Sequence, residues 1–273
     1  MTDARTVELR QRFRTLHTAD CFVIPNPWDV GSARLLAALG FPALATTSSG
    51  FAWSTGRRDN HVTLDDALAH IRLLSSAVDV PINADFEGGF AIDPQSVAAN
   101  VCRACDTGIA GLSIEDSTGD SVAPLFDFDL AVARVGAARH AIDRSASTVF
   151  LTARTEGFIA GRPDIDETIK RLVAFAEIGA DCLYAPGIRS TEHIAAVVAA
   201  VAPKPVNVLV SAPFATVEQL TALGVRRISV GGALARSAWG GFLRAAREIA
   251  RHGTFSSFAD AVPSPEMNGL FPE

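Results

Sequence analysis

The sequence has very few lysines and no excess of positive charge. Only Lys170 and Lys204 among its 24 basic residues are lysines, so catalysis by a tunable amine has little to draw on. The net charge of −6 excludes a sequence-wide attraction to nucleic acid or to an anionic membrane surface. No apolar run approaches the roughly 18 residues that span a bilayer, and the N-terminus lacks the apolar core of a secretion signal. We therefore expect a cytoplasmic protein whose partner is a small molecule, with no nucleic-acid or membrane partner.

Cysteine is also scarce, with four residues in the chain. Cys102 and Cys105 form one Cys-x-x-Cys pair, a spacing that redox and zinc sites use, but no second pair or His-x-His segment follows. The apolar pattern around the pair is helical. We interpret the two thiols as packing in a protein core rather than as a metal or redox site.

The chain does contain a regular alternation of two kinds of segment. Short apolar, β-rich runs recur, and each is followed by an amphipathic helical stretch. The eight runs are residues 21–24, 43–47, 81–85, 111–114, 148–153, 182–185, 206–209 and 227–230. Strands joined by crossover helices lie parallel, and eight such units can close on themselves and remove both sheet edges. The pattern predicts an α/β protein of the (β/α)8 TIM-barrel type.

Length and composition agree with one large core. The chain has 273 residues, of which 48% are hydrophobic, and such barrels typically take about 250 residues. We expect a single domain over residues 1–273, with the barrel at about 20–240 and a C-terminal helical tail at about 241–273. The tail is apolar and broken by prolines, so it would be exposed in a monomer, which favours a homo-oligomer.

Acidic residues collect where the predicted strands end, which is the end that carries the chemistry of such barrels. Asp59, Asp85, Glu87 and Glu115 lie there, with Arg154 opposite them. Buried like charges repel unless something compensates them. Mg²⁺ prefers oxygen ligands, keeps several waters and is typically held by one or two protein carboxylates. The sequence therefore predicts a magnesium site, for which Mn²⁺ is the alternative ion.

Neighbouring segments offer hydrogen-bond donors to an acid substrate. The turn formed by Ser48, Ser49 and Gly50 has backbone amides that nothing bulky covers, so it can bind a carboxylate. Arg154 and Asn207 can donate to carboxylate or enolate oxygens, the arginine through two nitrogens.

Taken in this order, the segments resemble the isocitrate lyase and phosphoenolpyruvate mutase superfamily from about residue 21 to 239. The resemblance rests on Pro-Trp-Asp-Val-Gly-Ser-Ala-Arg at 27–34, Thr-Ser-Ser-Gly at 47–50, Ala-Asp-Phe-Glu-Gly-Gly-Phe at 84–90, Ile-Glu-Asp-Ser at 114–117, Ala-Arg-Thr-Glu at 153–156 and Asn-Val-Leu at 207–209. It implies an α/β barrel, often with a C-terminal helix exchanged between the subunits of a dimer or tetramer. It also implies a divalent metal and an α-oxo acid.

The resemblance further implies a role for individual residues. Asp85 is similar to the direct metal ligand, and the acids expected to act through water are Asp59, Glu87 and Glu115. The substrate carboxylate would lie at Ser49, Gly50 and Phe51, and the remaining oxygens at Arg154 and Asn207. Trp28 stands where many members have a tyrosine against the substrate.

One loop departs from the family pattern. Residues 117–126 contain no lysine, cysteine or histidine, whereas the family's lyases carry lysine and a proton-handling cysteine there, and the mutases a lysine and an asparagine. An isocitrate or methylisocitrate lyase of the usual kind is therefore disfavoured, and mutase activity is too.

We expect a Mg²⁺-dependent lyase or decarboxylase that cleaves a C–C bond of a small 2-oxo or 2-hydroxy (di)carboxylic acid through a metal-stabilised enolate. Arg154 and Asn207 would stabilise the enolate, and Glu115 is the first choice of base. The alternatives are a phosphonomutase or a phosphonopyruvate-hydrolase type enzyme that cleaves a C–P bond, and a non-catalytic barrel that binds an oxo acid.

Overall fold

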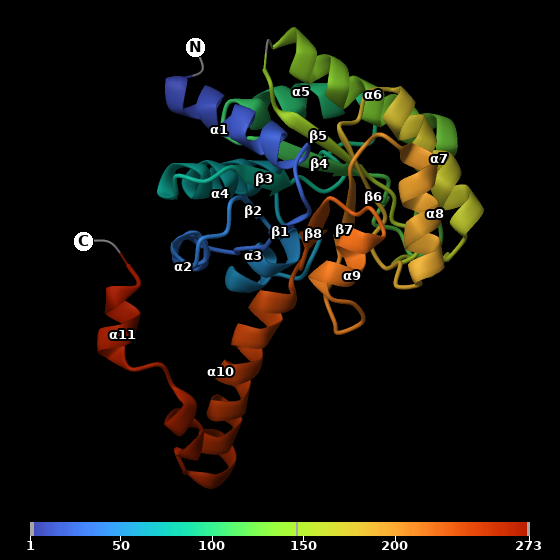
Figure 1. Cartoon of the computed structure of the whole chain (residues 1–273). Helices are drawn as coiled ribbons and strands as arrows, with labels where there is room; N and C mark the ends of the chain where they lie inside the picture. The colour runs from blue at the N-terminus through green and yellow to red at the C-terminus, as the bar shows by residue number, and fades with distance from the viewer. Residues whose placement is uncertain (1–2, 146, 272–273) are drawn as a thin grey trace.

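The computed structural model describes residues 3–145 and 147–271, so the ends of the expected domain, 1–2 and 272–273, lie outside it. Eight parallel strands form a nearly closed barrel surrounded by helices (Figure 1). The strands are β1 Phe22–Ile24, β2 Leu44–Ala45, β3 Ile82–Asp85, β4 Gly111–Glu115, β5 Phe150–Arg154, β6 Cys182–Tyr184, β7 Val206–Leu209 and β8 Arg227–Ser229. Each predicted run coincides with one strand apart from its end residues, so the predicted (β/α)8 barrel is confirmed.

Helices lie between the strands, and most of them follow an Asp, Ser or Thr residue that can cap the helix. They are α1 Ala4–Leu16, α2 Val30–Ala38, α3 Ser48–Ser54, α4 Leu64–Ala77, α5 Pro94–Cys105, α6 Phe128–Arg144, α7 Ile165–Glu177, α8 Thr191–Val201, α9 Val217–Ala222, α10 Ala233–His252 and α11 Ser264–Gly269, with a 3-10 turn at Ser256–Asp260. Asp29 and Thr63 cap α2 and α4 by accepting hydrogen bonds from backbone amides. The segment expected to be a plain turn at Ser48 instead opens α3, because Thr47 caps it.

The barrel closes through a weak seam between β1 and β2. Every other neighbouring pair of strands forms a ladder, in the order β1-β8-β7-β6-β5-β4-β3-β2. Across the seam, the amide of Ala45 donates to the carbonyl of Pro25 at 3.0 Å, and the side-chain nitrogen of Asn26 donates to the carbonyl of Thr46 at 3.0 Å. The Asn26 oxygen accepts from the amides that follow β8, at 2.9 and 2.8 Å. One buried side chain thus ties together the ends of β1, β2 and β8.

An apolar plug fills the barrel at the N-terminal ends of the strands. Phe13 of α1 is fully buried there and packs edge-on against Phe150 of β5. His17 stacks on the same Phe150 ring at 4.0 Å and is itself buried. Burial of a side chain such as Phe13 contributes roughly 1.5–3 kcal/mol. The open end of the barrel is therefore the C-terminal one.

The last helices leave the barrel. In Figure 1, α10 extends away from the strands, the chain turns back at its far end, and α11 lies to one side of α10 near the C-terminus. No helix among the described residues is both long and apolar enough to cross a membrane. The Cys-x-x-Cys pair lies in the last turn of α5, and both thiols are free and packed against the core, as expected from the sequence.

We predict that Asn26→Ala lowers the free energy of unfolding by about 3 kcal/mol, because it removes three buried hydrogen bonds of about 1 kcal/mol each. Urea denaturation measures the change. Asn26→Asp keeps the acceptor oxygens and should lose less, and Asn268→Ala, on exposed α11, should lose under about 0.5 kcal/mol. An Asn26→Ala variant as stable as the wild type would contradict the role of this side chain at the seam.

Candidate functional site

Strand register brings one row of polar side chains together inside the barrel. Glu115 of β4 pairs with Arg154 of β5, which pairs with Tyr184 of β6. The row continues from Tyr184 to Asn207 of β7 and from Asn207 to Arg227 of β8. Register partners on neighbouring strands point to the same face of the sheet. The row explains why residues far apart in the sequence meet.

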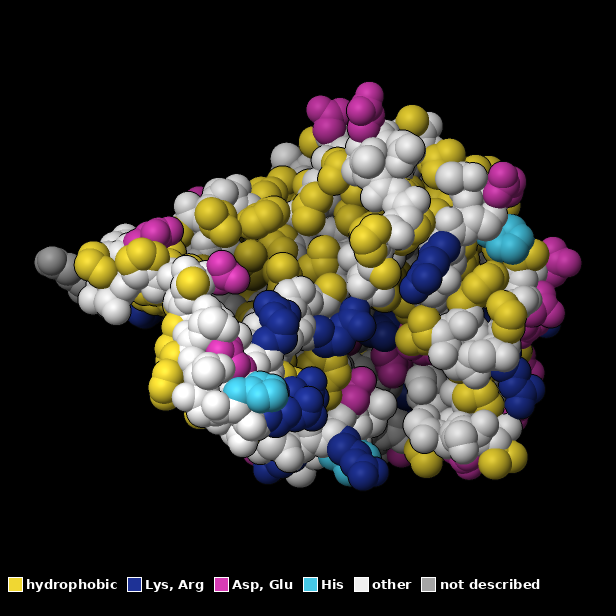
Figure 2. Space-filling view, turned by 90° about the horizontal axis from the view of Figure 1, so that it is seen from below, with side chains coloured by type: hydrophobic (Ala, Val, Ile, Leu, Met, Phe, Trp, Pro, Cys, Tyr) yellow, Lys and Arg dark blue, Asp and Glu magenta, His cyan; other side chains and the backbone are white. Residues whose placement is uncertain are grey.

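A cavity of about 180 Å³ opens above this row. It is lined by Ile24, Asn26, Ala45, Thr46, Thr47, Ser48, Ser49, Asp59, Asn83, Asp85, Ser113, Arg154, Tyr184, Asn207, Leu209, Arg227, Ser229, Gly231 and Gly232. The space-filling view of this side of the molecule is hollowed near its centre, with basic and acidic side chains in the hollow (Figure 2). The volume suits a molecule of a few heavy atoms rather than a nucleotide or a polymer.

Arg154 is the centre of the charged groups at the mouth. Its Nη1 lies 3.1 Å from Asp85 Oδ1 and 3.2 Å from Glu115 Oε2. Its Nε and Nη2 hold both carboxylate oxygens of Glu156, a fork-to-fork arrangement. One guanidinium therefore offsets part of the negative charge of these three acids, of which Asp85 and Glu115 are among those expected from the sequence. Part of the compensation expected from a metal ion thus comes from this arginine.

Burial and the neighbouring charges shift the pKa values of Glu115, Glu156 and Arg154. Loss of water raises the pKa of Glu115 well above its ordinary value, although Arg154 opposes the shift, and burial raises the pKa of Glu156 in the same way. Burial lowers the pKa of Arg154, but the charges of Glu115, Glu156 and Asp85 outweigh it and raise that pKa well above its ordinary value. Arg154 is therefore a permanent cation.

Asp85 is held from its other side by the start of α3. Its Oδ2 accepts from the amide of Ser48 at 3.0 Å and from the Ser48 hydroxyl at 2.9 Å. The side chain keeps 15% exposure. Asp85 thus combines a fixed orientation with access to the cavity, as a metal ligand needs.

Two further acids, Asp59 and Glu87, lie near Asp85 and form no salt bridge with any residue that the structure describes. Asp59 lines the same cavity from an exposed loop, and Glu87 follows β3 beside a neighbouring cavity that Glu115 also lines. Burial and the charges of Asp85 and Asp59 raise the pKa of Glu87 to about 8. Partial loss of water at the edge of the cavity and the charge of Asp85 likewise raise the pKa of Asp59, although the residue as a whole is exposed. This surplus of negative charge is what a bound cation would relieve.

The acidic groups at the barrel mouth fit Mg²⁺ bound through water. Among the described residues, no three Asp, Glu, His or Cys side chains approach closely enough to ligate one ion directly. Mg²⁺ does not require three, because it usually keeps waters and takes one or two protein carboxylates. An oriented Asp85 with Asp59 and Glu87 nearby fits such a hydrated ion.

The loop that carries Glu87 has an unusual backbone held by a distant helix. Glu87 and Phe90 have positive φ values of 45° and 55°. Arg134 of α6, which is 1% exposed, donates to the backbone carbonyls of residues 88, 91 and 92. Its guanidinium also lies 4.0 Å from the centre of the Phe126 ring. Helix α6 thus fixes the shape of the loop that presents Glu87.

Only some of the residues expected to contact the substrate line the cavity. Ser49 and Asn207 line the cavity, whereas Trp28, Gly50 and Phe51 are absent from its lining. The Phe51 ring stacks on His70 at 3.8 Å. A Cβ on Gly50 would lie 2.9 Å from the Trp28 Cβ, so this glycine allows α3 to pack closely.

Residues that sequence reasoning missed complete the cavity. Tyr184 is the single tyrosine of the chain, and the centre of its ring lies 5.3 Å from the Cζ atom of Arg154. Burial raises its pKa to about 12, so it stays protonated near neutral pH. Arg227 and Ser229 were not singled out either, and Ser48 was expected only as part of a carboxylate-binding turn, not as a hydrogen-bond donor to Asp85. The position of Tyr184 at a strand end was the available signal, but register was needed to see that the others face inward.

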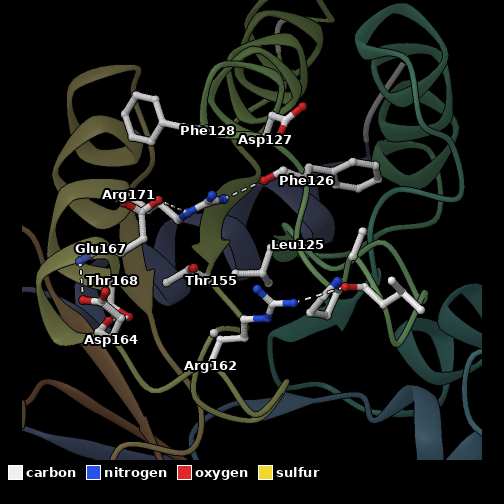
Figure 3. A pocket seen from close by; sticks show the side chains of 14 residues that line it. Leu125, Phe126, Asp127, Phe128, Thr155, Arg162, Asp164, Glu167, Thr168 and Arg171 are labelled. Atoms are coloured by element: carbon white, nitrogen blue, oxygen red, sulfur yellow. Dashed lines mark hydrogen bonds and ion pairs between the residues drawn. The ribbon is translucent and has the colours of Figure 1, made fainter.

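A larger cavity of about 520 Å³ lies outside this site, between residues 122–128 and α7 (Figure 3). Asp116 is buried here and pairs with Arg171 of α7 at 3.0 Å. Arg171 also donates to the carbonyl of Phe126 at 3.0 Å, and Arg162 donates to that of Val122 at 3.1 Å. Asp116 accepts from the Thr155 hydroxyl and from the amide of Glu156. It therefore holds the end of β5 in place and does not line the barrel-mouth cavity.

A family model described as phosphoenolpyruvate phosphomutase matches residues 13–250. The chain belongs to the phosphoenolpyruvate mutase and isocitrate lyase superfamily. The resemblance inferred from the sequence is confirmed, and so is the expectation of an enzyme of this type. Members of the superfamily generally depend on a divalent metal.

Relatives of this superfamily member include proteins of several activities. An uncharacterised protein of Mycobacterium tuberculosis is 32% identical over 216 residues, 79% of each chain. An oxaloacetate decarboxylase of Paraburkholderia xenovorans is 31% identical over 70% of this chain and 65% of its own. A solved Burkholderia cenocepacia structure, provisionally described as a lyase or mutase, has a TM-score of 0.95 at 47% identity, over 98% of this chain and 97% of its own. An oxaloacetate acetylhydrolase solved with its product oxalate has a TM-score of 0.86 at 27% identity, over 96% and 93%.

We predict that Arg154→Gln lowers the free energy of unfolding by about 3–5 kcal/mol near neutral pH, because it leaves buried carboxylates unpaired. The loss should shrink toward about pH 5. The folded-state pKa values of Glu115 and Glu156 lie above their unfolded values, so protonation at lower pH favours the folded state.

Urea unfolding at about pH 7.5 and about pH 5.5 measures both effects. Arg103→Gln is the matched control, because Arg103 pairs with Asp65 on the surface, and its loss should be under about 1 kcal/mol. An equal loss at both pH values for Arg154→Gln would contradict the assignment of the buried charge.

Proposed function

We propose that the protein is a divalent-metal-dependent lyase or decarboxylase that cleaves a C–C bond of a small 2-oxo or 2-hydroxy (di)carboxylic acid. The observation that carries the proposal is the pairing of Asp85 with Arg154 at 3.1 Å in a small cavity at the barrel mouth. Membership of the superfamily supports it, and so does the relative described as oxaloacetate decarboxylase. The reaction passes through an enolate of the oxo acid.

The cavity offers donors of the kind that a small acid needs. Arg154 and Asn207 lie in one row of the barrel and donate to oxygen atoms, and the Ser49 hydroxyl lies on the opposite wall. Tyr184 remains protonated and can donate as well. These groups orient the acid and meet the negative charge that develops on its 2-oxo oxygen.

Asp85 would hold the metal ion, with Asp59, Glu87 and Glu115 acting through its waters. Mg²⁺ is the expected ion and Mn²⁺ the alternative. The chemistry supplied by the bound ion is polarisation of the 2-oxo group. Ser48 contributes by fixing the Asp85 carboxylate.

The lining favours decarboxylation over a reaction that needs a strong base. Neither the barrel-mouth cavity nor its neighbour is lined by lysine, cysteine or histidine. In a 3-carboxy-2-oxo acid the bond to the departing carboxylate breaks, its electron pair forms the enolate double bond, and CO₂ leaves. A proton from water then completes the product. Retro-aldol cleavage of a hydroxy acid would need a base, for which Glu115 is the first choice.

Incubation with oxaloacetate and Mg²⁺ should release pyruvate, and EDTA should stop it. Asp85→Asn should lower kcat/KM by about 100-fold or more, since it removes the proposed metal ligand. Asp65→Asn makes the same chemical change on the surface of α4 and should leave the rate within about two-fold. A coupled lactate dehydrogenase assay measures the rate, and 2-methylisocitrate and dimethylmalate are tested in parallel.

Release of neither pyruvate nor glyoxylate from any of these acids would contradict the proposal for them. The family model, described as phosphoenolpyruvate phosphomutase, favours a C–P bond enzyme as the second candidate. Phosphorus NMR of phosphonopyruvate would then show a new resonance. If every turnover assay is silent while Mg²⁺ and oxalate raise the melting temperature, the chain is a binding barrel.

We also propose that the C-terminal segment mediates a homodimer or homotetramer, with α10 packing against a neighbouring subunit. The apolar side chains exposed on it include Trp239, Phe242, Leu243, Ile249, Phe255 and Phe258. Figure 2 shows hydrophobic side chains along the projecting segment. A surface of this kind is expected to be covered in solution.

Phe242→Ser should therefore shift the protein to a smaller assembly in light scattering coupled to size exclusion, because Phe242 is 60% exposed at the centre of α10. Leu39→Ser, at a 70% exposed position next to α2, is the control and should leave the mass unchanged. A wild-type protein that is monomeric at all concentrations would contradict this assembly.

A further inference from the structure

Arg227 begins β8 and extends its side chain into the barrel beneath the active cavity. It is 3% exposed and still lines that cavity. Its Nε donates to Asn207 Oδ1 at 2.9 Å, and its Nη2 donates to Thr152 Oγ1 at 3.0 Å. Its Nη1 lies 3.3 Å from Nε2 of His17. All three partners are side chains without a negative charge.

The His17 ring is neutral and accepts from Arg227. Its Nδ1 lies 2.8 Å from the carbonyl of Phe13, so Nδ1 carries the hydrogen and Nε2 the lone pair. Burial and the charge of Arg227 lower the pKa of His17 to about 3. Nothing at this end of the guanidinium offsets its charge.

Other buried arginines of the chain are differently placed. Arg154 and Arg171 each pair with carboxylates, and Arg10 and Arg134 bind backbone carbonyls outside the active cavity. No carboxylate of the described residues forms an ion pair with Arg227. A buried charge without a counter-ion is costly to keep. Its cavity-facing position indicates that the counter-charge is a ligand.

Arg227 also decides how the Asn207 amide lies. A guanidinium has donors only, so Asn207 must turn its oxygen toward Arg227 and its nitrogen away. That nitrogen donates to the Ser229 hydroxyl at 2.9 Å and has a second hydrogen to offer. Since Asn207 lines the cavity, the result is a donor held toward a bound oxygen atom.

We propose that Arg227 is a positioning residue of the active site, which orients Asn207 as a donor and places a fixed positive charge beneath a bound dicarboxylate or oxo-acid anion. The inference rests on the proposed function, because it assumes that the cavity binds such an acid. Arg227 would then be a second cation of the site besides Arg154, with Tyr184 and Asn207 between them in the row. Arg154 is neutralised by acids, and Arg227 is not.

Two substitutions of Arg227 separate charge from packing. Arg227→Lys keeps a cation and a donor, whereas Arg227→Gln keeps polar bonding without the charge. Oxalate binding with Mg²⁺, measured by calorimetry, should weaken by about ten-fold or more in Arg227→Gln and by under about three-fold in Arg227→Lys. Arg226→Gln, at the exposed neighbouring position, is the control and should bind oxalate as the wild type does.

Asn207→Asp places a carboxylate at the position from which Asn207 Oδ1 now accepts a hydrogen bond from Arg227. It should raise the melting temperature, because Arg227 gains an ion pair, and should weaken oxalate binding by about ten-fold or more. A structural role alone predicts equal loss of stability in both Arg227 variants with unchanged oxalate affinity, and that result would overturn the inference.

Oxalate binding and oxaloacetate turnover are measured in both the wild-type protein and Arg227→Gln, to separate this inference from the proposed function. Wild-type protein that binds no oxalate overturns the proposed function and this inference together. Wild-type protein that binds oxalate and turns over oxaloacetate, with Arg227→Gln equal to it in both, overturns the inference alone. In the expected case kcat falls more than KM rises in Arg227→Gln, because the charge on the enolate oxygen is largest during bond cleavage.

Discussion

The site is organised around Arg154 and the carboxylates that surround its guanidinium. Asp85, Glu115 and Glu156 come from three different strand ends, and each would be costly to bury alone. Their common cation, the Arg154 guanidinium, contacts all three carboxylates beside a cavity. The arrangement leaves Asp85 oriented and partly exposed, which is what any ion or oxo acid would meet first. Ser48 at the start of α3 and the amide contacts of Asp116 then hold the surrounding strand ends in place.

The barrel could be predicted because its signal is repeated along the chain. Alternating apolar runs and amphipathic helices define eight units, and the strand-end rule selects Asp85, Glu115 and Arg154 from many polar residues. These local patterns do not contain the strand register, so the row that joins Tyr184 to Arg227 was not foreseen. The sequence pattern also could not show which of these side chains point into the cavity.

Residues next to each other in a motif can serve different surfaces. Glu115 faces the mouth, while the following Asp116 turns outward to Arg171. Phe51 follows Ser49 closely but stacks on His70 away from the cavity. The motif around position 50 also contains a glycine that packing alone requires. Sequence adjacency therefore selected segments at the barrel mouth, and only the fold could say which member of each segment faces the cavity.

The seam between β1 and β2 gives the cavity one compliant wall. The β4, β5 and β6 side is a continuous ladder, whereas the opposite side is joined by the few bonds around Asn26. Ser48 and Ser49 lie just beyond β2, and Gly231 just beyond β8, so both flank this weaker edge. Arg154 therefore lies on the side of the barrel with the most strand-to-strand hydrogen bonds, and the Ser48 side of the cavity is held by fewer of them.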